Sequence, residues 1–191
     1  MVRLAFIACL LAFASLAAAE APGSKALRVL FIGNSLTYTG DIPGRVAKLA
    51  AAMGRKAEVE SVAYPSFSLE DHWLDGRALA AIRKGWDVVV LQQGPSSQAD
   101  GRASLADYAM RFAKPIREAG AKPALYMVWP PSDRLRDFGG TISAYREAAK
   151  GTDGILAPVG EAWLRALSVD KRACASTATP CTLRPWAATL R

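Results

Sequence analysis

The first residue along the chain that could take part in catalysis is a serine directly after a short apolar run. The run Arg28-Val-Leu-Phe-Ile32 is followed by Gly33-Asn34-Ser35-Leu36-Thr37. A serine at a tight strand-to-helix turn exposes its hydroxyl, and its backbone N–H can point at a developing oxyanion. Such a serine suits nucleophilic attack on a carbonyl carbon. A serine here can equally cap the following helix, and the tripeptide alone does not choose between these roles.

Three further segments with polar or aromatic side chains follow apolar runs. They are Tyr64-Pro65-Ser66-Phe67-Ser68-Leu69-Glu70-Asp71-His72-Trp73 after Val62, Gln92-Gln93-Gly94-Pro95-Ser96 after Leu91, and Trp129-Pro130 after Val128. The side-chain amide of Gln92 or Gln93 could donate a hydrogen bond to an oxyanion, or both could simply hold the loop. Trp129 is expected to line a pocket, or else to stiffen the wall of its loop.

Few residues in the chain could act as the catalytic base for such a serine. His72 is the one histidine, and once the N-terminal apolar run that holds Cys9 is set aside, only two cysteines remain beside it, too few for the usual four-ligand zinc site. That count weighs against a zinc site. Asp71, Asp133 and Asp137 are available carboxylates, but a base must lie within hydrogen-bond reach of the serine, and no motif places any of them there.

An alternation of strands and helices would bring these segments together. The pattern predicts strands at 28–32, 58–62, 87–91, 123–128 and 154–156, and helices at 43–53, 74–83, 104–119, 141–150 and 160–167. The β-branched run 87–91 is typical of a strand buried on both faces. We therefore expect one α/β domain whose five-stranded parallel sheet is covered on both faces. Ligands bind at the carboxyl ends of such strands, which is where the four segments lie.

The run Val29-Leu-Phe-Ile-Gly-Asn-Ser-Leu-Thr37 resembles the first sequence block of the SGNH hydrolases, the GDSL esterase and lipase superfamily. The resemblance covers residues 28–167 and implies a flavodoxin-like three-layer α/β/α sandwich. It implies that Ser35 is the nucleophile and that its N–H is one oxyanion donor. It also implies an ester, acyl or acetyl substrate, on a small molecule or a carbohydrate, and no metal or organic cofactor. Asn34, His72 and Trp129 are then expected at the substrate, with a purely structural role as the alternative for His72.

Two blocks depart from the superfamily pattern. The second block has a glycine whose N–H donates to the oxyanion, and this position falls near Ser66. The backbone N–H survives the change, but serine reaches a positive φ less cheaply than glycine. The third block normally supplies an asparagine amide, and Gln92 or Gln93 stands in its place.

The fourth block, a D-x-x-H motif that supplies the base, is missing from residues 168–191. This tail contains no histidine, shows no helical periodicity, and holds Cys174 and Cys181, for which a disulfide is one reading. If the codons of this tail are read in a shifted frame, they can encode Asp-x-x-His-Pro-x-x-x-Gly, which is the order of the superfamily's fourth block. We interpret the tail as the result of a frameshift between about Leu167 and Ala173, with the last helix missing or altered and catalysis impaired.

The first nineteen residues read as a secretory signal peptide. Arg3 precedes the apolar run 4–16, and Ala17-Ala18-Ala19 fits a cleavage site. The expected organisation is a signal peptide at 1–19, a hydrolase-like domain at 20–167 and an atypical tail at 168–191. The run is too short for a span of ~20 residues, so we expect a secreted or periplasmic protein without stable membrane insertion after cleavage.

Charge and motif patterns weigh against other function classes. The formal net charge is +7, but the basic residues are scattered rather than gathered on one face, so nucleic acid is not an expected partner. A nucleotide binder is disfavoured because Gly33-Asn-Ser is not a phosphate-cradling glycine loop. The remaining alternative to an enzyme is a non-catalytic carbohydrate- or ligand-binding module that uses the same pocket.

Overall fold

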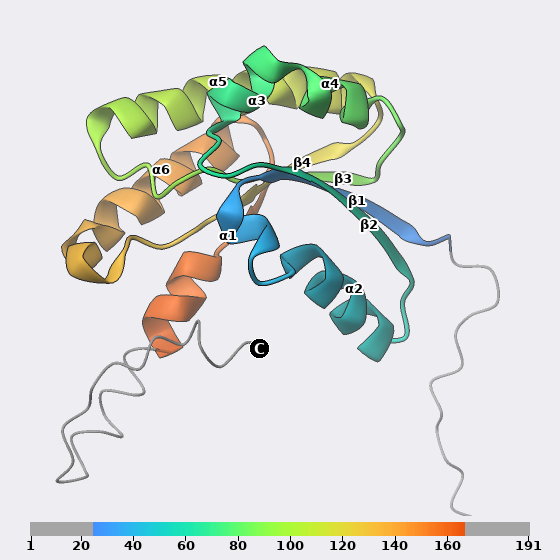
Figure 1. Ribbon diagram of the computed structural model, residues 1–191, viewed down its shortest axis with the longest axis horizontal. Coiled ribbons are helices and arrows are strands. Elements are labelled where there is room, and N and C mark those ends of the chain that lie inside the picture. Colours follow the sequence, from blue (N-terminus) through green and yellow to red (C-terminus); the bar gives the residue numbers. More distant parts are fainter. Residues whose placement is uncertain (1–24, 167–191) are drawn as a thin grey trace, which may run out of the picture.

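The computed structural model describes residues 25–166 (Figure 1). The strands are β1 (Leu27–Gly33), β2 (Ala57–Ala63), β3 (Val88–Leu91), β4 (Lys122–Tyr126) and β5 (Ile155–Ala157). The helices are α1 (Ser35–Tyr38), α2 (Ile42–Ala52), α3 (Leu69–Asp75), α4 (Arg77–Ile82), α5 (Ala99–Glu118) and α6 (Phe138–Gly151), with a 3₁₀ helix η1 at Ser132–Asp137 and helical residues at 159–166. The expected signal peptide and tail, including Cys174 and Cys181, lie outside the described residues.

The five strands form one parallel sheet in the order β2-β1-β3-β4-β5. The chain runs outward from β1 to β2 and then returns to place β3 on the other side of β1. Strand order therefore reverses beside β1, and such a switch point opens a crevice at the carboxyl ends of the strands. The Gly33-Asn34-Ser35 turn follows β1 at this point. The predicted five-stranded parallel α/β sheet is confirmed.

Helices cover the sheet on both sides, which gives three layers (Figure 1). Helices α3, α4 and α5 lie on one face, and α6 packs against α5, β4 and β5. Helices α1 and α2 lie on the opposite face, as does the helical segment 159–166. Within residues 25–166, no helix is both long and apolar enough to cross a membrane.

The core lies between the central strands and the two helix layers. Leu30, Ile32, Val89, Leu91 and Leu125 are fully buried, as expected for the continuous apolar strands of a parallel sheet with both faces covered. The core therefore fixes the strand ends, and with them the loops that follow at the carboxyl edge.

Two helices replace the single one expected at 74–83. They meet at Gly76, which has a φ of 80°. Helix α3 begins at Leu69 because Ser68 and Asp71 form a capping box, in which each side chain accepts a hydrogen bond from the other residue's backbone N–H. The S-x-x-D spacing was a readable signal for this start. It places His72 inside a helix rather than on a loop.

Helices α5 and α6 also begin earlier than predicted, at Ala99 and Phe138 instead of residues 104 and 141. In both cases the added turns precede the apolar periodicity from which the starts were predicted. The extension of α5 has a consequence for the site, because its first turn reaches the loop that follows β3.

Candidate active site

The serine after β1 occupies the first position of a short helix. Asn34 is the N-cap of α1, and its side chain accepts a hydrogen bond from the N–H of Leu36 at 3.1 Å. Asn34 therefore performs the capping role, which leaves the hydroxyl of Ser35 unused for that purpose. Among residues 25–166, neither the hydroxyl nor the N–H of Ser35 has a hydrogen-bond partner. Ser35 is half-buried at the switch point of the sheet.

Gln92 holds this turn in place from β3. Its Oε1 accepts hydrogen bonds from the N–H of Asn34 at 2.9 Å and from the hydroxyl of Thr37 at 2.7 Å. Its Nε2 donates to Asn34 Oδ1 at 3.0 Å and to the carbonyl of Gln93 at 2.7 Å. Both hydrogens of the amide are thus used, and the side chain is 1% exposed. The structure places Gln92 as a buried brace of the turn, with no hydrogen left for an oxyanion.

Gly33 makes room for that brace. A Cβ atom at this position would collide with the hydroxyl of Thr37 and with Oε1 of Gln92. The glycine therefore permits a close approach of these side chains, which would have to shift if residue 33 carried a Cβ atom. The packing of the turn therefore explains the glycine at position 33 of the motif without reference to catalysis.

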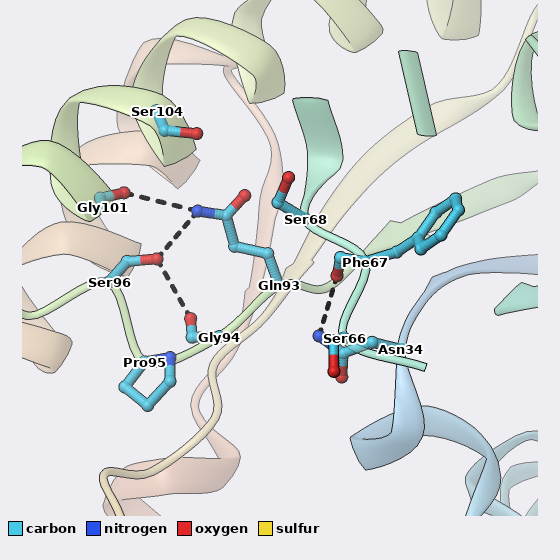
Figure 2. Close-up of a pocket in the computed structure, with 10 residues that line it drawn as sticks. All are labelled: Asn34, Ser66, Phe67, Ser68, Gln93, Gly94, Pro95, Ser96, Gly101 and Ser104. Carbon is cyan, nitrogen blue, oxygen red and sulfur yellow. Dashed lines mark hydrogen bonds between the residues drawn. The ribbon is translucent and has the colours of Figure 1, made fainter. Parts of the chain in front are cut away.

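The loop after β2 is fastened against the same turn. The N–H of Tyr64 donates to the carbonyl of Gly33 at 3.2 Å, and Asn34 Nδ2 donates to the carbonyl of Phe67 at 3.0 Å. Between them, Ser66 has a φ of 60°, in the left-handed region that favours glycine. Figure 2 shows Ser66 beside Asn34. The N–H of Ser66 has no acceptor among the described residues, so the loop presents a free donor at this position.

Gln93 forms a second bridge, away from the turn (Figure 2). Its Oε1 accepts from the N–H of Leu69 at 3.1 Å. Its Nε2 donates to Ser96 Oγ at 2.9 Å and to the carbonyl of Gly101 at 3.3 Å. The hydroxyl of Tyr145 donates to the Gln93 carbonyl at 2.7 Å. The amide hydrogens of Gln93 are therefore also committed, so neither glutamine presents a free amide donor.

His72 lies beneath the site rather than at its surface. It is 0% exposed, and its Nε2 lies 2.7 Å from the carbonyl oxygen of Gly33. Because a carbonyl only accepts, Nε2 carries the proton and donates. Nδ1 has no partner among the described residues, and burial lowers the pKa of the ring, against a smaller raising effect of the hydrogen bond to Gly33. The structure thus places His72 in a buried position against the Gly33 carbonyl, where it can support the turn.

Two of the three carboxylates considered as alternative bases have other partners. Asp71 Oδ2 accepts from the N–H of Ser68 at 2.8 Å and from its hydroxyl at 2.7 Å, and these hydrogen bonds lower its pKa. Asp137 forms an ion pair with Arg134. Asp133 is exposed at the start of η1. Among residues 25–166, no group of three or more His, Cys, Asp or Glu side chains is arranged to hold a metal ion.

Trp129 belongs to an aromatic group on the β4–β5 side of the site. Its ring stacks on Trp163 with centroids 5.7 Å apart and an interplanar angle of 13°. Trp163 in turn stacks on Phe138 at 5.7 Å and 24°. Neither Trp163 nor Phe138 was anticipated, because the three rings come from segments far apart in the sequence.

A cavity of about 430 Å³ lies beside the turn. Three of the residues expected at the site line it: Asn34, Ser66 and Gln93. Its remaining lining comes from Phe67, Ser68, Gly94, Pro95, Ser96, Gly101 and Ser104. None of the described residues that line the cavity carries a charged side chain. Gln92, His72 and Trp129 lie elsewhere, and Ser35 is joined to the cavity through its neighbour Asn34.

Comparison with known proteins places this fold in a class. No protein-family description matches the chain, and no curated protein matches it. Thirty-one solved chains do match. A protein from Slackia heliotrinireducens assigned to the SGNH hydrolases is 27% identical, with a TM-score of 0.66 over 87% of this chain and 94% of that one.

Two further structures share the fold at lower identity. TesA is 20% identical, with a TM-score of 0.55 over 68% of this chain and 76% of its own. AlinE4, an SGNH-hydrolase family esterase, is 13% identical, with a TM-score of 0.52 over 82% of this chain and all of its own. The three-layer α/β/α sandwich is thus the SGNH hydrolase fold. The chain therefore shares the fold of the SGNH hydrolases, as the resemblance around Ser35 predicted.

Proposed function

We propose that this protein is an exported serine hydrolase of the SGNH type that cleaves an ester, acyl or acetyl group through Ser35. The observation that carries the proposal is the pair of backbone N–H groups of Ser35 and Ser66. Both lack partners among the described residues, and their loops are held together by the hydrogen bond from Asn34 to Phe67. An oxyanion hole requires free backbone N–H donors beside a serine hydroxyl, and in this proposal these two groups supply them.

The proposed reaction has two stages. Ser35 Oγ forms a bond to the carbonyl carbon of the substrate while the N–H groups of Ser35 and Ser66 donate to the oxygen that becomes negative. The bond from that carbon to the alcohol oxygen then breaks, the alcohol leaves with the proton from Oγ, and an acyl-enzyme remains. Water attacks this acyl-enzyme, which releases the acid and restores the serine. The superfamily's third donor has no counterpart in Gln92 or Gln93, whose amides are committed elsewhere.

We further propose that catalysis is impaired in this chain. The proton transfer from Ser35 needs a base, and the one histidine of the sequence is committed as a donor to Gly33. Without a triad base, the oxyanion donors and binding typically leave a rate only ~10³–10⁴-fold above water. The signal-like segment 1–19 supports export, to the periplasm or outside the cell. Esters of small molecules or carbohydrates are the proposed substrates; a neighbouring structure, AlAXEase, is an acetyl xylan esterase.

A covalent probe tests the proposed nucleophile. The full-length protein is incubated with a serine-directed fluorophosphonate, with and without added imidazole as an external base, and the adduct is mapped by peptide mass spectrometry. We expect slow labelling at Ser35 that imidazole accelerates, and none in Ser35→Ala. Ser143→Ala is the matched control, because Ser143 lies on α6 with its hydroxyl bonded to Glu147.

The same labelling experiment distinguishes the hydrolase from the non-catalytic binding module. If Ser35 is unlabelled with and without imidazole, the hydrolase proposal fails and a non-catalytic ligand-binding module is favoured, for which the committed His72 is the supporting observation. The rate of p-nitrophenyl acetate hydrolysis measures how far catalysis is impaired. Turnover well beyond 10⁴-fold over water that disappears in Ser35→Ala would contradict the impairment and leave the nucleophile intact.

A further inference from the structure

Helix α2 carries an apolar stripe that the fold covers over only part of its length. Ile42, Val46, Leu49 and Met53 recur at helical spacing, so they share one face of the helix. Ile42 and Val46 pack against the core. Leu49 and Met53, at the end of the same stripe, are 64% and 77% exposed. The second half of the stripe is therefore largely open to solvent.

Basic side chains flank this exposed pair in the sequence. Lys48 and Arg55 are exposed, and neither side chain has a hydrogen bond or an ion pair among the described residues. Residues 42–57 contain no aspartate or glutamate. The next two carboxylates along the chain, those of Glu58 and Glu60, form ion pairs with cations of other elements. The end of α2 therefore combines apolar side chains with positive charge that no carboxylate of the helix balances.

Exposed apolar side chains on the opposite helix layer have different neighbours. Leu74 on α3 is 74% exposed and is followed by Asp75, whereas Met110 on α5 is 51% exposed and lies beside the ion pair of Asp107 and Arg111. Both helices lie on the sheet face opposite to α2 (Figure 1). These two positions therefore serve as internal references for the surface of α2.

The charges of that surface select among three possible occupants. A second copy packed by symmetry would bring Lys48 and Arg55 of both chains into one interface, where like charges repel. Residues 168–191 also carry the wrong sign, with Lys171, Arg172, Arg184 and Arg191 against Asp170. An anionic bilayer matches both features, because its headgroups attract cations and its acyl boundary accepts apolar side chains.

We propose that the end of α2 docks this protein on an anionic phospholipid surface. Leu49 and Met53 enter the boundary between headgroups and acyl chains, while Lys48 and Arg55 stay at the level of the headgroup phosphates. Such docking is peripheral and needs no membrane-spanning helix. The inference stands on the surface of α2 alone and does not depend on the proposed hydrolase function.

Methionine oxidation tests this contact at single positions. The full-length protein is treated with hydrogen peroxide alone, with phosphatidylcholine vesicles, and with vesicles of phosphatidylcholine and phosphatidylglycerol in equal parts. Each methionine sulfoxide is then quantified by peptide mass spectrometry. We expect the mixed vesicles to slow oxidation of Met53 at least about fivefold and to leave Met110 unchanged, with much less protection by phosphatidylcholine alone. The readout is local because the apolar run 4–16 could bind vesicles by itself.

Two variants with the same change in charge separate docking from general electrostatics. Leu49→Asp should abolish the protection of Met53. Leu74→Asp is the matched control and should preserve it, because Leu74 is similarly exposed but lies in the opposite layer. Lys48→Gln, at an exposed position, carries the test if circular dichroism shows that Leu49→Asp does not fold. It should raise the lipid concentration for half-protection about fivefold, the factor that one cation near an anionic surface contributes.

Several outcomes would overturn the docking surface. They are the absence of Met53 protection, equal protection by the two kinds of vesicle, and equal protection of Met53 and Met110. Oxidation of Met53 that is slower than that of Met110 without vesicles overturns it as well, because the end of α2 is then already covered. Recovery of the Met53 rate on dilution would identify a second copy as the cover, and a rate independent of protein concentration would identify residues 168–191.

Discussion

Replacing Gln92 by leucine tests whether this residue is the brace of the Ser35 turn. The change keeps a side chain of similar size but removes four hydrogen bonds, to Asn34 twice, to Thr37 and to the Gln93 carbonyl. The site is buried, because Gln92 is 1% exposed and Asn34 and Thr37 are buried too. Because water cannot readily replace the lost partners, the polar groups of Asn34, Thr37 and Gln93 that bonded to Gln92 would stay buried without a hydrogen bond, which destabilises the folded state.

The expected loss of stability follows from those partners. Each hydrogen bond contributes about 1 kcal/mol net, and each buried polar group left without a partner costs about 1–3 kcal/mol. The added apolar contact of leucine offsets part of this cost. We therefore expect Gln92→Leu to lower the free energy of unfolding by about 3–5 kcal/mol, which is a large share of the ~5–15 kcal/mol of a typical domain.

Urea denaturation followed by circular dichroism measures this loss. Gln98→Leu is the control, because Gln98 is exposed on the same loop and its side chain makes one hydrogen bond of 3.4 Å to Asp137. This control should stay within about 0.5 kcal/mol of wild type. A loss below about 1 kcal/mol in Gln92→Leu, less than one net hydrogen bond would give, would refute the brace and return the Gln92 amide as a candidate oxyanion donor.

Two further predictions concern the loop after β2 and the helix below it. Ser66→Gly should raise the free energy of unfolding by up to about 1 kcal/mol, because the relief of the left-handed φ exceeds the cost of the added chain entropy of glycine. Urea denaturation measures this change. A lower free energy of unfolding in the variant would show instead that the Ser66 side chain contributes to stability. Burial lowers the pKa of His72 in the folded state, so below pH ~6.5 the unfolded chain binds a proton that the folded chain does not. Stability should therefore fall as pH drops below about 6.5, by at most ~1.4 kcal/mol per pH unit, and this component should vanish in His72→Phe. Equal pH slopes in the two proteins would contradict the buried neutral ring.

Local patterns in the sequence were sufficient for the architecture. The β-branched and apolar runs at 28–32 and 87–91 predicted strands of a parallel sheet, because buried strands read as continuous apolar segments whatever their neighbours. The turn at Ser35 was predicted for a similar reason, since a strand followed by Gly-Asn-Ser is a local pattern. The capping box of Ser68 and Asp71 was also local, and the S-x-x-D rule would have found the start of α3.

The roles of the site residues depended on partners that lie far away in the chain. Gln92 meets Asn34 across 58 residues, and His72 meets Gly33 across 39. Spacing cannot say which hydrogen of an amide is already used, or which ring nitrogen faces a carbonyl. By itself, the sequence determined an α/β sheet, a serine at the end of β1 and a single histidine. Only the tertiary structure decided that both glutamine amides are committed and that the histidine is a buried donor, because the folded sheet is what brings these polar groups within hydrogen-bonding distance.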